Sequence, residues 1–89
     1  MIRQTLVISN KLGLHARASA KLTKLAGTFR SEVHLSRNGR RVNAKSIMGV
    51  MMLAAGLGSE VEVETDGPDE AEAMAALRAL VDGKFGEGQ

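Results

Sequence analysis

The sequence of 89 residues contains no cysteine, which excludes disulfide bonds and thiolate metal sites. It also lacks tryptophan and tyrosine, so its 2 phenylalanines are its only aromatic side chains apart from histidine. Proteins that bind single-stranded nucleic acid commonly stack the bases on aromatic rings. The scarcity of such rings argues against that function, although 12 Lys and Arg against 10 Asp and Glu leave the chain mildly basic.

Long apolar segments are absent as well. Residues 1–4 lack the long apolar run of a signal peptide, and no later apolar stretch has the length of a transmembrane helix. We therefore expect a cytoplasmic protein without membrane insertion. The length of 89 residues suits one domain spanning residues 1–89, which we expect to be a monomer.

The spacing of apolar residues predicts an alternation of strands and helices. Period-two alternation predicts a strand at residues 2–8, a hairpin at 31–41 and a strand at 60–65. Helical spacing predicts helices at 16–26, at 47–55 and from 69 to 83. This βαββαβα order indicates an α+β fold, in which one antiparallel sheet is covered on one side by helices.

The hairpin has the strongest local signal in the chain. Asn38 and Gly39 both tolerate positive φ, as a two-residue type I′ turn requires. Such a turn pairs Leu35 with Val42, so two apolar side chains share one face. His34 then lies on the opposite face, where we expect an ordinary surface residue.

Helix ends are predicted from capping residues. Ser46 is a suitable N-cap for the short second helix. Asp69 and Glu72 have the spacing of a capping box at the start of the last helix, which Gly83 ends. We expect residues 84–89 to form a frayed tail.

The second helix is apolar on almost every side. One stripe is expected to be buried, and it comprises Val50, Leu53, Ala54 and Leu57. The other is expected to be an exposed surface for protein docking, and it comprises Ile47, Met48, Met51 and Met52. Complete burial of this helix is the alternative.

His15 stands between the first strand and the first helix. The first N–H groups of a helix lack internal partners and carry partial positive charge, which favours phosphate. A lone histidine is more often structural than catalytic, but at this position its imidazole can also accept a phosphoryl group covalently. We expect the helix start and Arg17 to oppose protonation of the ring, leaving it nucleophilic.

A phosphoryl group on His15 would meet the backbone N–H groups of Ala16, Arg17 and Ala18 and the guanidinium group of Arg17. Lys21 and Lys24 continue a basic stripe from Arg17, which is either a docking surface or a solvated helix face. No nucleotide-binding motif is present, and no carboxylate lies near His15 in the sequence. These features indicate a relay rather than a self-sufficient enzyme, and neither a cofactor nor a metal is expected.

Two blocks carry a resemblance to a known family. They are Gly13-Leu14-His15-Ala16-Arg17 and Asn43-Ala44-Lys45-Ser46-Ile47-Met48-Gly49. In these blocks and in its order of elements, the chain resembles the HPr phosphocarrier family of the bacterial phosphoenolpyruvate-dependent phosphotransferase system. The resemblance implies an open-faced β-sandwich, a four-stranded antiparallel sheet covered on one face by three helices. Ala18 stands where the family usually has proline.

The resemblance also implies partners. Enzyme I would phosphorylate the δ nitrogen of His15, and an enzyme IIA domain would take the group for sugar uptake or regulation. In some members a dedicated kinase, an HPr serine kinase/phosphorylase, modifies the serine that corresponds to Ser46. For Ser46 the alternative is a simple helix cap.

Two other functions remain open from the sequence. One is a small basic nucleic-acid-binding module that uses Arg37, Arg40 and Arg41. The other is a regulatory binding module that keeps the fold and acts through Ser46.

Overall fold

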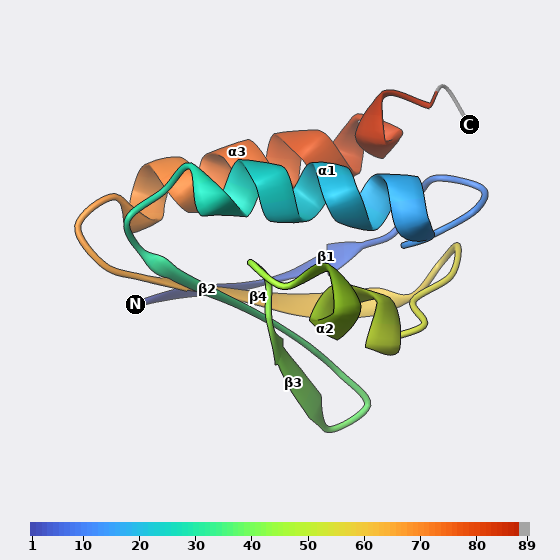
Figure 1. The fold of residues 1–89 in the computed structure, drawn as a ribbon, viewed down its shortest axis with the longest axis horizontal. Coiled ribbons are helices and arrows are strands. Elements are labelled where there is room, and N and C mark those ends of the chain that lie inside the picture. The colour runs from blue at the N-terminus through green and yellow to red at the C-terminus, as the bar shows by residue number, and fades with distance from the viewer. Residues whose placement is uncertain (88–89) are drawn as a thin grey trace.

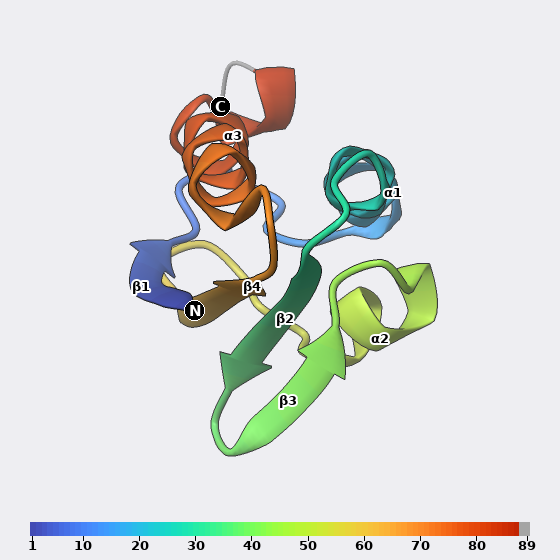
Figure 2. The ribbon, with the colours of Figure 1, turned by 90° about the vertical axis from the view of Figure 1, so that its left-hand side faces the viewer.

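The computed structural model describes residues 1–87 as a sheet with helices on one of its faces (Figures 1 and 2). The antiparallel sheet has the order β1-β4-β2-β3, with bounds β1 Ile2–Val7, β2 Glu32–Arg37, β3 Arg40–Asn43 and β4 Glu60–Asp66. The helices are α1 Ala16–Gly27, α2 Ile47–Met52 and α3 Glu70–Asp82, followed by a 3-10 turn, η1, at Lys84–Gly86. This architecture confirms the α+β sandwich expected from the sequence. None of the helices in residues 1–87 is long and apolar enough to cross a membrane.

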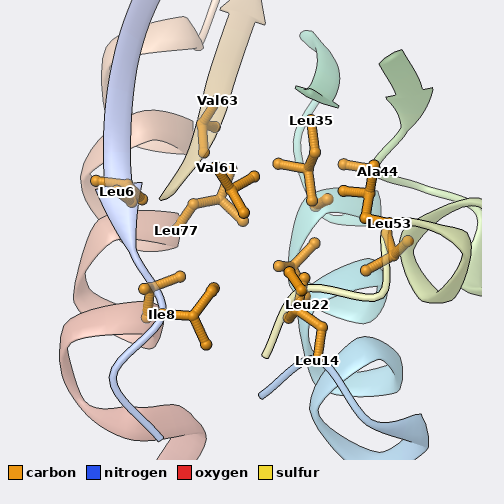
Figure 3. Close-up of a cluster of buried hydrophobic side chains, with 14 of the residues drawn as sticks. Leu6, Ile8, Leu14, Leu22, Leu35, Ala44, Leu53, Val61, Val63 and Leu77 are labelled. Atoms are coloured by element: carbon orange, nitrogen blue, oxygen red, sulfur yellow. The ribbon is translucent and has the colours of Figure 1, made fainter. Parts of the chain in front are cut away.

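The core lies between the sheet and the helices because alternate strand residues point to the same face. The central strand β4 pairs Val61 with Leu6 of β1 and Val63 with Leu35 of β2, so these apolar side chains line the inner face. Leu22 of α1 and Leu77 of α3 cover them and are equally buried (Figure 3).

The hairpin forms as predicted. Asn38 and Gly39 adopt φ angles of 52° and 78°, which is the left-handed pair of a type I′ turn. Leu35 pairs with Val42, and His34 lies on the outer face of the sheet, opposite Asn43.

The predicted capping box at the start of α3 is wrong. Asp69 is the N-cap residue, but its side chain makes no cap hydrogen bond. Its carboxylate instead accepts hydrogen bonds from the backbone N–H of Arg30 and from the N–H and hydroxyl of Ser31. These bonds tie α3 to the segment before β2, and they lower the pKa of Asp69 to about 2, the Ser31 hydroxyl first among the causes.

Helix α2 is shorter than predicted. It ends at Met52, with Leu53 as C-cap, and Ala54 adopts a positive φ of 51° that turns the chain away from the helix. Val50 and Leu53 are buried as expected, but Ala54 and Leu57 are exposed because they lie beyond the helix end. The predicted buried stripe is therefore only half correct.

The glutamates of β4 differ in their exposure to water. Glu64 is buried, because its strand is central and neighbouring strands place Arg3 and Arg41 beside it. The hydrogen bond from Arg41 is the main cause that lowers the pKa of the Glu64 carboxyl. The outer face of the sheet thus carries its own charge network.

The chain after α3 is not a frayed tail over residues 84–87. Phe85 is only 1% exposed and belongs to the hydrophobic core. Burial of this ring holds Lys84 and Phe85 at φ angles of 56° and 55°, a left-handed conformation that is unfavourable for both. The rest of the predicted tail, residues 88–89, lies outside the described residues.

Candidate functional site

His15 is the N-cap residue of α1, with extended backbone angles of φ −72° and ψ 178°. The first helical hydrogen bond runs from the N–H of Ser19 to the carbonyl of His15, at 2.8 Å. The N–H groups of Ala16, Arg17 and Ala18 precede that bond, and no side chain caps them from position 15. The structure thus places an imidazole beside three helix-start donors, as the sequence indicated.

The loop before His15 is anchored to the segment that follows α2. Gly13 has a φ of 66°, and a Cβ there would lie 2.4 Å from the carbonyl oxygen of Ala55, so only glycine fits. Leu14 donates its N–H to that same oxygen at 2.8 Å. Ser19 in turn donates its hydroxyl to the Leu14 carbonyl at 3.0 Å. These contacts hold the helix start in place.

Glu87 is a site residue that the sequence did not reveal. Its carboxylate is hydrogen-bonded to Nε2 of His15. No carboxylate lies near His15 in the sequence, but the fold brings this one into contact with the imidazole. In Figure 1 the C-terminal turn, coloured red, stands at the same end of the molecule as the start of α1. Asn10, and after it His15, lower the pKa of the Glu87 carboxyl below its usual value.

A shallow open hollow surrounds the imidazole. It is lined by Lys11, Leu12, His15, Ala16, Arg17, Gly86 and Glu87. Arg17 is exposed, and its guanidinium group makes no hydrogen bond or ion pair within residues 1–87. The hollow therefore offers an anion a free guanidinium group and the helix-start N–H groups.

The two lysines of the basic stripe have different surroundings. Lys21 donates a hydrogen bond from Nζ to the carbonyl of Phe85, at 2.6 Å. Lys24, in the last turn of α1, is exposed. Lys21 therefore helps to hold the C-terminal turn against α1, a role that the sequence did not indicate.

The second block of the sequence forms an exposed apolar patch on α2. We call it the α2 patch, and its exposed fractions are 45% for Ile47, 72% for Met48, 39% for Met51 and 59% for Met52. Complete burial of this helix is thereby excluded. Ser46 is its N-cap, and its hydroxyl oxygen accepts a hydrogen bond from the N–H of Gly49 at 3.2 Å.

The three hairpin arginines proposed as nucleic-acid contacts all bind protein groups. Arg37 and Arg40 donate to backbone carbonyls at the end of α2, at 3.0 and 3.4 Å. Arg41 pairs with Glu64 at 3.2 Å. This engagement argues against the nucleic-acid alternative, because those charges are already partly compensated.

Comparisons with known proteins agree with these features. The family model described as PTS HPr component phosphorylation site matches residues 2–82. The phosphocarrier protein HPr of Cupriavidus necator is 70% identical over 89 residues, covering 100% of both chains. The phosphocarrier protein HPr of Neisseria meningitidis is 61% identical over the same length, again with 100% coverage of each.

Solved structures agree in fold as well as in sequence. The crystal structure of HPr-C-His from Thermoanaerobacter tengcongensis superposes with a TM-score of 0.95 at 44% identity, covering 98% of each chain. A phosphocarrier protein HPr from Bacillus anthracis gives a TM-score of 0.87 at 41% identity, covering 90% of this chain and 95% of that one. From its sequence and its architecture alike, the chain belongs to the HPr phosphocarrier family of the phosphotransferase system.

Proposed function

We propose that this protein accepts a phosphoryl group from enzyme I on the δ nitrogen of His15 and passes it to an enzyme IIA domain. The observation that carries the proposal is the position of His15, directly before three helix N–H groups without intrahelical partners. Such donors stabilise the oxygens of a phosphoryl group held at the helix start.

The transfer is a displacement at phosphorus. The lone pair of Nδ1 forms the new bond, while the bond between phosphorus and the donor breaks and its electron pair leaves with the donor. Ala16, Arg17 and Ala18 donate backbone N–H groups to the phosphoryl oxygens, and the Arg17 guanidinium group adds charge. In the onward step a nucleophile of the enzyme IIA domain forms the new bond to phosphorus, and the electron pair of the nitrogen–phosphorus bond returns to the ring.

Enzyme I would dock on the α2 patch and on the basic stripe at Lys21 and Lys24. Exposed methionines suit a surface that must bind more than one partner, because their side chains adapt in shape. We propose a cytoplasmic monomer as the working form. A Thermoanaerobacter tengcongensis relative, with a TM-score of 0.79 and 44% identity, is described as an HPr dimer.

The proposal is tested by incubating the protein with enzyme I and labelled phosphoenolpyruvate. The wild type should take up one acid-labile phosphoryl group, and His15→Ala should take up none. His34→Ala is the matched control, because His34 lies on the outer face of the sheet. Uptake by His15→Ala, or no uptake by the wild type, would contradict the proposal.

A further inference from the structure

A chain of polar contacts connects the helix-start loop to the imidazole. The side-chain Nδ2 of Asn10 donates to the carbonyl of Gly13 at 2.8 Å and to Oε1 of Glu87 at 3.0 Å. The second carboxylate oxygen of Glu87, Oε2, is hydrogen-bonded to Nε2 of His15. The two carboxylate oxygens therefore have different partners.

Asn10 fixes the direction of its own two hydrogen bonds in this chain. Its side chain is 0% exposed, and its amide nitrogen lies between two oxygen acceptors. Reversing the amide would place Oδ1 against both oxygens, which is repulsive. The observed orientation is kept even though Oδ1 accepts no hydrogen bond within residues 1–87.

The protonation pattern of the imidazole follows from this arrangement. An ionised carboxylate only accepts hydrogen bonds, so the proton between Glu87 and His15 is on Nε2. The lone pair of a neutral ring is then on Nδ1. We propose that Glu87 is a positioning residue that fixes the Nε2–H tautomer of His15, so that Nδ1 alone is the nucleophile.

The consequence for catalysis rests on the proposed function. When Nδ1 bonds to phosphorus, the ring gains positive charge, and the Glu87 carboxylate at Nε2–H stabilises that charge. When the group is passed on, the electron pair returns to Nδ1 and the neutral ring keeps its proton on Nε2. Glu87 touches neither phosphorus nor the attacking atom and acts only through the imidazole.

The C-terminal turn holds Glu87 in position. Phe85 is anchored in the core, and its carbonyl accepts the hydrogen bond from Lys21. The turn therefore presents the carboxylate from a fixed backbone rather than from a free chain end.

The substitution Glu87→Gln gives a sharp test. Asn10 Nδ2 requires an oxygen opposite it, so the glutamine would turn its oxygen to Asn10 and its amide group to His15. That amide donates, so Nε2 of His15 must become an acceptor and the proton must move to Nδ1. A control with the same chemical change is Glu72→Gln, since Glu72 is exposed on α3.

The tautomer is read from ¹⁵N NMR of the His15 ring at pH 8, above the usual range of imidazole titration. We expect Nε2–H in the wild type and in Glu72→Gln, and Nδ1–H in Glu87→Gln. A shift to about nine-tenths Nδ1–H should slow phosphoryl acceptance from enzyme I about tenfold, because only the remaining fraction is competent.

A wild-type ring protonated on Nδ1, or an unchanged tautomer in Glu87→Gln, would overturn the proposal. This measurement uses the unphosphorylated protein alone, so it does not depend on the relay. If the wild type accepts no phosphoryl group but shows the expected tautomers, the relay fails while the role of Glu87 in setting the tautomer stands.

Discussion

Replacing Phe85 by alanine tests whether the C-terminal turn belongs to the folded core. The ring is 1% exposed and packs in the main hydrophobic cluster, and removing such a ring costs about 3–5 kcal/mol. If the turn is released, relaxation of the left-handed Lys84 and Phe85 returns about 1–2 kcal/mol per residue.

The same release loses the hydrogen bonds that Lys21 and Asn10 donate to the turn, each of which involves one charged group and contributes about 1.5–3 kcal/mol. These opposing effects are similar in size. We therefore expect the free energy of unfolding to fall by about 3–5 kcal/mol. At about 4–8 °C per kcal/mol, Tm should fall by at least about 12 °C.

Urea and thermal unfolding should be followed by far-ultraviolet circular dichroism, because the chain has no tryptophan or tyrosine. Phe29 is the matched control, since it is the only other phenylalanine and is half-buried. Phe29→Ala should cost about 1–2 kcal/mol. The reasoning would be refuted if Phe85→Ala lost less than about 1 kcal/mol, or no more than Phe29→Ala.

Three further predictions concern α2 and the start of α3. Met48→Asp should weaken binding to enzyme I, measured by calorimetry, and change the free energy of unfolding by less than about 0.5 kcal/mol. Val50→Asp should instead unfold the domain, because the new carboxylate is buried without a partner. Reversed stability effects would show that the wrong stripe was assigned to docking. Ser46→Asp should keep the fold and slow phosphorylation of His15 by weakening the encounter with enzyme I, and equal phosphorylation rates would exclude a regulatory role. The pKa of Asp69 is lowered from 3.8 to about 2 in the folded protein. The ionised carboxylate therefore stabilises the folded state above pH 4, and this stabilisation is lost as the pH falls toward 2. Urea unfolding of wild type and Asp69→Asn over that range should show the difference between them shrinking as pH falls, and a constant difference would contradict the assignment.

Features set by neighbouring residues were predictable from the sequence. The Asn38–Gly39 turn and the Ser46 cap each depend on residues within one turn of chain. His15 at the start of α1 follows from the same kind of local pattern. The exposed face of α2 followed from its having two apolar stripes and only one sheet to cover.

Features set by distant residues were not predictable. Glu87 and His15 are 72 positions apart, and Asp69 and Ser31 are 38 apart, so no local pattern indicates either pair. Asp69 had a convincing local partner in Glu72, but the tertiary bonds to Ser31 were formed instead. The available signal for the C-terminal turn was a single aromatic residue, Phe85, in an otherwise polar end segment.

The central claim is that His15 carries the phosphoryl group on Nδ1. It is tested most directly by ¹⁵N and ³¹P NMR of the protein after incubation with enzyme I and phosphoenolpyruvate. We predict one phosphorus nucleus coupled to Nδ1 of His15 and no phosphorylation elsewhere in the chain. Phosphorus on Nε2 of His15, on His34 or on Ser46, or no phosphorylation at all, would contradict the account.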